Sequence, residues 1–290
     1  MSALYRGYDA AALEAQYNAR ASVPSFEAEY AKYVRASAAA QAAIPRRAGI
    51  VYDAASGQTL DFYSGQPGAP LFVWIHGGYW RAPSAQDNAL AAGGPHRRGF
   101  HVAVIDYALA PAVALDEIVR QARAALAYLH RERGALGIGP QPFAVGGSSA
   151  GGHLAAMLLS GSWQAPLGLP DDPVGVALDL SGLHDLTPLR WTQVNEWMAF
   201  DDGLIARNSP MRLIPARSGA HLIASVGGRE TDEFIRQTDD YVAAWRAAGH
   251  RATRVLMPDH NHFDIALSLR EPDGALVEAL VAAHGEGART

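Results

Sequence analysis

A serine between glycines is the first feature of the chain that could carry out chemistry. Residues 147–151 read G-S-S-A-G, which matches the pattern G-x-S-x-G with Ser149 at its centre. The apolar run 143–145 precedes it and a helical run over 153–159 follows, which is the strand-turn-helix context of a nucleophile elbow. A helix N-terminus at this point would favour developing negative charge. A dinucleotide loop is a poor alternative, because the spacing does not give G-x-G-x-x-G.

A serine nucleophile needs a general base and a carboxylate that orients it, and the end of the chain offers both. His262 follows the last predicted strand, with His260 as its competitor. In the chain order serine, acid, histidine, the acid belongs just after the penultimate predicted strand, 222–226. Glu230 lies nearest that strand end, whereas Asp232 falls in the first turn of a predicted helix, where acidic residues usually serve the helix dipole. We predict Glu230 as the acid, with Asp232 as the alternative.

The H-G-G sequence after the apolar run 71–75 indicates an oxyanion hole. Glycines allow the backbone to approach a substrate closely, and their N–H groups can point at a developing oxyanion. We therefore predict the N–H groups of Gly77, Gly78 and Ala150 as its donors.

Three side chains of the same segment are candidates for substrate binding: His76, Tyr79 and Trp80. We expect His76 to hold the loop by hydrogen bonding rather than to act as a base. Tyr79 and Trp80 could line the acyl or leaving-group pocket, and ordinary packing is the alternative. Trp191 and Trp197 could stack on an aromatic leaving group, or belong to a helical cap over the core.

Composition limits the class of protein. The 290 residues are 49% apolar and 18% charged, which supports a large packed core and excludes general disorder. Lys and Arg number 24 against 29 Asp and Glu, without a basic run, so we expect neither nucleic acid nor a membrane as a partner. The absence of cysteine excludes a disulfide framework and a thiolate nucleophile. We see no secretory signal and no apolar run near the ~18–20 residues of a membrane span, and expect a cytoplasmic protein.

A metal site is not predicted. His260 and His262 form an H-x-H pair, but no further histidine or carboxylate cluster stands at ligand spacing. We therefore expect no metal and no organic cofactor, and a small acyl amide or ester as the partner molecule. The oligomeric state stays open, with a homodimer as one possibility.

Apolar runs that alternate with helical periodicity predict an α/β fold with a mostly parallel central sheet flanked by helices. We expect one domain over 1–290, in which residues 1–45 form a helical N-terminal extension. Whether 1–45 or 187–210 gates the pocket stays open. The predicted strands are 49–54 and 59–63, a hairpin around Ser56-Gly57, then 71–75, 102–105, 143–145, 175–180, 222–226 and 252–256. The predicted helices are 8–19, 25–43, 84–98, 115–133, 150–160, 232–248 and 274–284.

The motifs together resemble the α/β-hydrolase superfamily, and within it the H-G-G-x-W subgroup of the kynurenine formamidases (arylformamidases). Residues 76–80 read H-G-G-Y-W, and three further stretches are similar to that family: 17–24, 230–237 and 261–264. The resemblance implies an α/β-hydrolase fold and hydrolysis of N-formyl-L-kynurenine to L-kynurenine and formate, without metal or organic cofactor.

Carried over position by position, the resemblance implies Ser149 as nucleophile and His262 as base. The acid position falls on Glu230, where the family usually has Asp, and Ser148 stands where the formamidases often have His. A short-acyl carboxylesterase or amidase is the alternative function, because triad and oxyanion hole serve both esters and amides. A non-catalytic binding protein is disfavoured, because it would not need to retain the H-G-G loop together with Ser149, Glu230 and His262.

Overall fold

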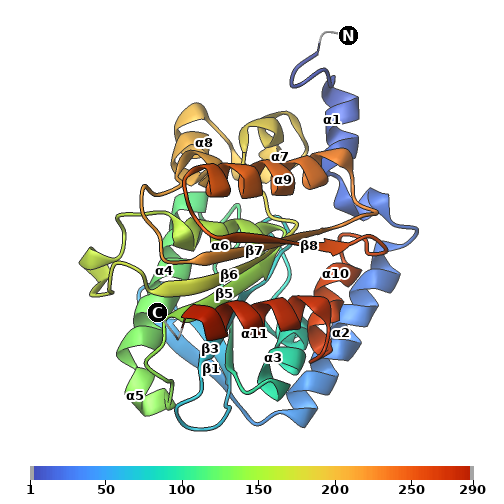
Figure 1. Ribbon diagram of the computed structural model, residues 1–290. Coiled ribbons are helices and arrows are strands. Elements are labelled where there is room, and N and C mark those ends of the chain that lie inside the picture. Colours follow the sequence, from blue (N-terminus) through green and yellow to red (C-terminus); the bar gives the residue numbers. More distant parts are fainter. Residues whose placement is uncertain (1–2, 288–290) are drawn as a thin grey trace.

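An eight-stranded sheet forms the centre of the computed structural model, which describes residues 3–287 (Figure 1). Its strand order is β1-β2-β4-β3-β5-β6-β7-β8. The pairs β1–β2 and β2–β4 are antiparallel, and the other five neighbouring pairs are parallel. The predicted mostly parallel sheet is therefore confirmed. The strands are β1 (Arg46–Asp53), β2 (Gln58–Tyr63), β3 (Leu71–Ile75), β4 (His101–Ile105), β5 (Phe143–Ser148), β6 (Val174–Leu180), β7 (His221–Gly227) and β8 (Ala252–Met257).

The central strands are apolar on both faces because helices cover both sides of the sheet. In β3, Val73 and Ile75 pack into one hydrophobic cluster, and Phe72 and Trp74 pack into the other. The first cluster includes side chains of the helices at 10–17, 115–131, 150–159 and 232–247, and the second includes side chains of the helical segments at 26–43, 86–92, 264–267 and 275–287. A strand buried on both faces needs an uninterrupted apolar run, which is the pattern that the sequence shows.

The helical elements connect these strands and cover their two faces. The α-helices are α1 (Ala10–Tyr17), α2 (Phe26–Ala43), α3 (Gly93–Arg97), α4 (Leu115–Arg131), α5 (Arg133–Leu136), α6 (Ala150–Leu159), α7 (Asn195–Met198), α8 (Asp202–Asn208), α9 (Asp232–Ala247), α10 (Asp264–Leu267) and α11 (Ala275–Gly287). The 3₁₀ helices are η1 (Ala19–Ser22), η2 (Gln86–Ala92), η3 (Ala165–Leu167), η4 (Thr187–Trp191), η5 (Pro210–Arg212) and η6 (Ser268–Arg270). No helix within residues 3–287 has the length and apolarity needed to cross a membrane.

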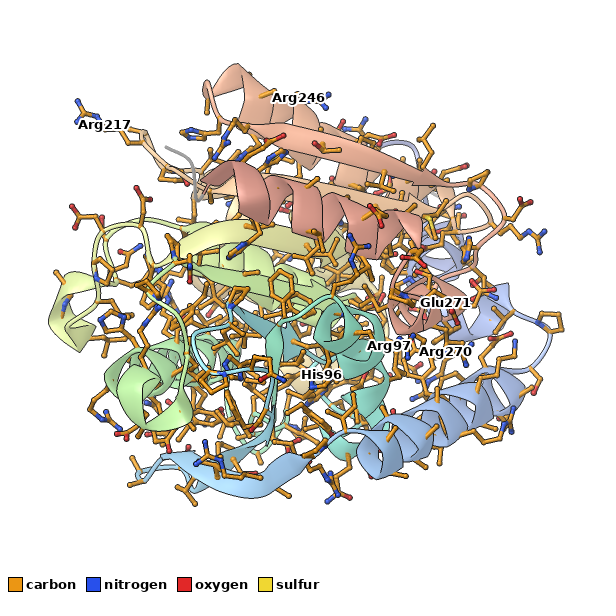
Figure 2. The ribbon with its side chains drawn as sticks, turned by 60° about the horizontal axis from the view of Figure 1, so that its bottom comes forward. His96, Arg97, Arg217, Arg246, Arg270 and Glu271 are labelled. Atoms are coloured by element: carbon orange, nitrogen blue, oxygen red, sulfur yellow. The ribbon has the colours of Figure 1, made fainter. Side chains whose placement is uncertain are left out.

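Two segments differ from the helices that the sequence predicts. The helix expected over 84–98 is divided into η2 and the short α3, whose Gly93-Gly94-Pro95 start has low helix propensity. There α3 packs on η6, where the Arg97 guanidinium donates a hydrogen bond to the carbonyl oxygen of Arg270 (Figure 2). The second segment, 187–212, forms four short helices (η4, α7, α8 and η5), too brief to produce a periodic pattern.

A buried histidine–carboxylate pair ties the end of β6 to α9. Asp179 and His184 are both almost fully buried, and the Nε2 of His184 contacts the Asp179 carboxylate. The His184 ring stacks on Tyr241 of α9 at 4.1 Å, and its backbone N–H donates to the Gln237 side chain at 2.6 Å. The pair therefore holds the loop after β6 against α9.

We expect Asp179→Ala to lower the free energy of unfolding by about 3–5 kcal/mol, because it leaves His184 buried without its partner. The exposed pair of Asp259 with Arg229, 3.5 Å apart, provides the control. Asp259→Ala should change the same quantity by less than about 1 kcal/mol, since water screens such pairs. Urea denaturation of both variants measures the difference, and equal losses would contradict this role of Asp179.

Candidate active site

The turn between β5 and α6 presents Ser149. This residue has φ 58° and ψ −118°, a backbone conformation that costs a non-glycine residue about 1–3 kcal/mol. Its N–H donates to the carbonyl oxygen of Leu180 at 2.8 Å. A Cβ at Gly151 would lie 2.0 Å from the carbonyl oxygen of Ile75, so only glycine fits there. The small residues of the motif therefore let the turn press against the end of β3.

His262 and Glu230 meet at the carboxyl ends of β7 and β8. The His262 Nδ1 lies 2.5 Å from the Glu230 Oε2. The other oxygen of Glu230 accepts hydrogen bonds from the Ser181 hydroxyl at 2.6 Å and from the Gly227 N–H at 2.7 Å. Within residues 3–287, the Nε2 of His262 has no hydrogen-bond partner. This arrangement leaves Nε2 available to take a proton, as a general base must.

The other candidates for base and acid lie apart from this pair. Asp232 is exposed in the first turn of α9, where it adds negative charge to a helix N-terminus. The Nδ1 of His260 is buried and, among the described residues 3–287, has no partner. The structure thus brings Glu230, and not Asp232, to His262.

Ser181 is a residue of this site that the sequence analysis did not select. It immediately follows β6, at the same edge of the sheet as the other site loops, and it has a φ of 52°. Its hydroxyl is directed at the Glu230 carboxylate. The signal in the sequence that could have identified Ser181 is its position as a polar residue directly after an apolar strand.

The H-G-G loop lies directly against Ser149. A Cβ on Gly77 would stand 2.6 Å from the carbonyl oxygen of Ser148 and 3.2 Å from the Cβ of Ser149. In the described part of the chain, the N–H groups of Gly77, Gly78 and Ala150 have no protein acceptor. N–H groups without an acceptor can stabilise an oxyanion, so their assignment as oxyanion donors stays a prediction that this arrangement allows.

Two of the predicted substrate contacts are buried instead. His76 is fully buried; its ring stacks on Tyr107 at 4.1 Å, and burial lowers its pKa, so it is neutral near pH 7. Trp80 is also fully buried and packs edge-on against His153 and Phe200. Neither side chain faces solvent, and both pack against buried aromatic neighbours, so contact of either with a substrate stays a prediction.

The loop after Gly77 adopts an unusual backbone. Gly78, Tyr79 and Trp80 have φ values of 95°, 49° and 57°, three consecutive residues in the left-handed region. Such a run is strained for the two aromatic residues and persists only when neighbours hold it. Its conformation therefore depends on contacts from elsewhere in the chain.

Three distant segments supply these contacts. The Tyr79 hydroxyl donates to the carbonyl oxygen of Tyr17 at 2.6 Å, and the Trp197 Nε1 donates to the Tyr79 carbonyl at 3.1 Å. The N–H of Ala110 donates to the Trp80 carbonyl at 2.8 Å. Trp197 lies in the segment 187–212, named the cap segment from here on, and contacts the loop. Its stacking on a ligand stays a prediction.

The N-terminal helices also hold the loop that carries Glu230. The hydroxyl of Thr231 donates to the carbonyl oxygen of Gln16 at 2.6 Å, and the Tyr17 hydroxyl donates to Glu233 at 2.8 Å. Figure 1 shows α1 and α2 on the side of the molecule toward which the β8 arrow points. The segment of residues 3–22 therefore joins the loop of the predicted oxyanion donors to the loop of the predicted acid.

The cap segment is anchored to the helix that follows Ser149. His153 of α6 pairs through Nε2 with the carbonyl oxygen of Asn208 in α8 at 2.7 Å. Burial lowers the pKa of His153 to about 3, so its ring is neutral and Nε2 carries the donated proton. This contact fixes α8 relative to α6.

Comparisons with known proteins find similarity to kynurenine formamidases and to esterase-like structures. The BD-FAE family model matches residues 60–168. Kynurenine formamidase of Salmo salar is 29% identical over 245 residues, covering 82% of this chain and 81% of the relative, and that of Danio rerio is 28% identical with the same coverage. A proposed thioesterase of Silicibacter sp. TM1040 has a crystal structure with a TM-score of 0.81 and 27% identity, covering 93% of this chain and 98% of that one. An esterase of Pyrobaculum calidifontis shares the fold at a TM-score of 0.72 and 17% identity, covering 90% and 91% of the two chains.

The sheet, the serine turn and these neighbours define the chain as an α/β-hydrolase, and it is a hydrolytic enzyme. Within that class it resembles kynurenine formamidase.

We expect Glu230→Gln to lower kcat by about 10³- to 10⁴-fold, because loss of the carboxylate removes the group that orients His262 and stabilises its imidazolium. Asp232→Asn should change kcat by less than about twofold, since its carboxylate is exposed. Steady-state hydrolysis of p-nitrophenyl acetate measures both variants. A larger loss in Asp232→Asn would overturn the assignment of the acid.

We also expect Tyr79→Phe to lower kcat by about three- to tenfold with little change in KM, since one neutral hydrogen bond holding the strained loop is lost. Tyr52→Phe is the matched control, because its hydroxyl donates to a backbone carbonyl, that of Asp106, at 2.6 Å. The two variants should be compared in the same ester assay. Equal effects on kcat would show that Tyr79 has no special influence on the loop.

Proposed function

We propose that this hydrolase cleaves N-formyl arylamides, with N-formyl-L-kynurenine as the substrate and L-kynurenine and formate as the products. The observation that carries the proposal is the 2.5 Å contact of His262 with Glu230, formed at the sheet edge where Ser149 and the free N–H groups of the H-G-G loop meet. The substrate is supported by kynurenine formamidase relatives that align over 82% of the chain.

In the proposed mechanism, the Ser149 hydroxyl attacks the formyl carbon while the His262 Nε2 takes its proton. Glu230 stabilises the imidazolium that forms, through Nδ1. The negative charge on the formyl oxygen rests on the N–H groups of Gly77, Gly78 and Ala150. His262 then gives its proton to the nitrogen of the arylamine as the C–N bond breaks.

The second half of the proposed reaction releases formate from Ser149. Water attacks the formyl ester carbon and transfers a proton to the His262 Nε2. The tetrahedral intermediate collapses, the ester bond breaks, and His262 returns the proton to the Ser149 oxygen. The enzyme is thereby restored, and no redox step or further reactant is required.

A short-acyl carboxylesterase or amidase is the second candidate. The Silicibacter protein, at 27% identity over nearly the whole chain, is described as a proposed thioesterase. The same nucleophile and oxyanion donors can act on esters, thioesters and activated amides, so the acyl and leaving groups must be tested directly.

The test compares N-formyl-L-kynurenine with p-nitrophenyl acetate, using the unmodified enzyme and Ser149→Ala. We expect kcat/KM for the formamide of ~10⁴ M⁻¹s⁻¹ or more, and a loss of several powers of ten in the variant. Turnover of the ester alone, abolished by Ser149→Ala, would support the carboxylesterase instead. Full activity in Ser149→Ala would contradict the serine mechanism.

A further inference from the structure

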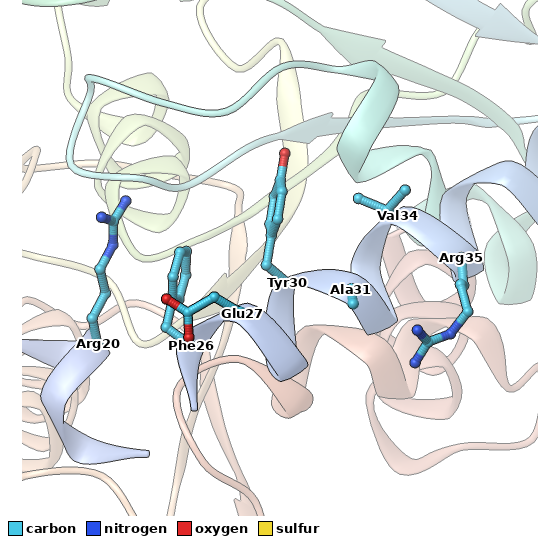
Figure 3. A pocket seen from close by; sticks show the side chains of 7 residues that line it. All are labelled: Arg20, Phe26, Glu27, Tyr30, Ala31, Val34 and Arg35. Atoms are coloured by element: carbon cyan, nitrogen blue, oxygen red, sulfur yellow. The ribbon is translucent and has the colours of Figure 1, made fainter. Parts of the chain in front are cut away.

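A groove of about 570 Å³ runs along the first turns of α2. Figure 3 shows the side chains of Arg20, Phe26 and Tyr30 along this groove, all pointing to the same side of the N-terminal segment. Glu27 lies between the two aromatic residues in sequence and also lines the groove. The groove thus combines an aromatic surface with one positive and one negative side chain.

The groove lies next to the loop that carries the proposed base. The Phe26 ring is 5.3 Å from the ring of Phe263, which is 5.5 Å from the imidazole of His262. The hydroxyl of Tyr33, on the same helix, donates to the Phe263 carbonyl at 2.7 Å. Phe26 is therefore linked to His262 by two successive aromatic contacts, through Phe263.

The N-terminal segment that carries Arg20 also contacts the H-G-G loop. Arg20 follows Tyr17 by three residues, and the Tyr17 carbonyl accepts the hydrogen bond from Tyr79. Tyr30, at the far end of the aromatic surface, donates through its hydroxyl to the Asp87 carboxylate at 2.8 Å. The segments that border the groove therefore contact the H-G-G loop, through Tyr17, and the loop of His262, through Phe26.

The charges of the groove are available to a ligand. The guanidinium of Arg20 lies 4.3 Å above the Phe26 ring, is exposed, and has no ion pair or hydrogen bond with any residue in the range 3–287. The backbone N–H of Glu27, the Ser25 hydroxyl, which donates to its carboxylate at 3.0 Å, and the nearby charge of Arg20 lower the pKa of Glu27, so it is ionised near pH 7. The Phe26 and Tyr30 rings stack at 5.9 Å and 20° between them.

We infer that this groove recognises the amino-acid end of an aromatic α-amino acid substrate. Arg20 binds the carboxylate, Glu27 binds the ammonium group, and Phe26 packs against the carbon skeleton that connects them to the aryl formamide. This inference rests on the proposed function and deepens it, because it assigns the residues that select a charged leaving group over a plain arylamine.

Arg81 is the other cation near the loop, 4.7 Å above the Trp197 ring, and it also has no ion pair within the described chain. It does not line the groove and lies on the side of the cap. Arg20 is therefore the better placed of the two for a carboxylate in the groove, and Arg81→Gln distinguishes between them.

The experiment measures kcat and KM for N-formyl-L-kynurenine and for 2′-formamidoacetophenone, which has the same aryl formamide but no amino-acid group. Arg20→Gln should lower kcat/KM for N-formyl-L-kynurenine about tenfold, mainly through a higher KM. The effect on the neutral analogue should be much smaller. Arg20→Lys should recover part of the loss, because it restores the charge without the planar guanidinium.

Arg47→Gln is the matched control, since Arg47 is also an exposed arginine over an aromatic ring, 5.5 Å from the centre of Phe62 on β2. It should leave both substrates unaffected. Equal losses on both substrates in Arg20→Gln, or a selective loss in Arg81→Gln alone, would overturn the inference while the formamidase assignment stands. No turnover of either formamide by the unmodified enzyme would instead overturn the proposed function.

Discussion

The close approach of backbone segments around Ser149 is the constraint on which the rest of the site depends. Ser149 has a positive φ, and the chain after it passes so close to the end of β3 that Gly151 has no room for a side chain. Without contacts from the surrounding structure, Ser149 would leave this backbone conformation, since the conformation costs about 1–3 kcal/mol. The hydrogen bond from Ser149 to Leu180 and the packing of α6 against the sheet hold it in place.

The H-G-G-Y-W loop adds a second strained segment beside the first. Its left-handed residues are held by a hydrogen bond to the Tyr17 carbonyl and by hydrogen bonds from Ala110 and Trp197, which belong to three separate parts of the chain. The N-terminal helices and the cap segment are consequently structural parts of the site. A change in either of them would alter the position of the loop that carries the predicted oxyanion donors Gly77 and Gly78.

Two histidine–carboxylate pairs in this protein differ in what they can do. His184 is enclosed: Nε2 contacts Asp179 and Nδ1 lies 3.2 Å from the carbonyl of Gln237, so neither nitrogen is free to exchange a proton. His262 uses only Nδ1, on Glu230, and keeps Nε2 unpaired within the described chain. The surroundings of the two pairs, rather than their residue types, separate a structural pair from one suited to catalysis.

The sequence by itself determined the central strands, the serine turn and the candidates Ser149 and His262, and it narrowed the predicted acid to Glu230 or Asp232, because apolar runs and turn motifs express local preferences. Only the tertiary structure decided that Glu230 and not Asp232 contacts His262, and that Trp80 is buried. It also decided that Tyr17 and Trp197 hold the loop after Gly77. These outcomes depend on contacts between residues 32 to 118 positions apart, which no local pattern specifies.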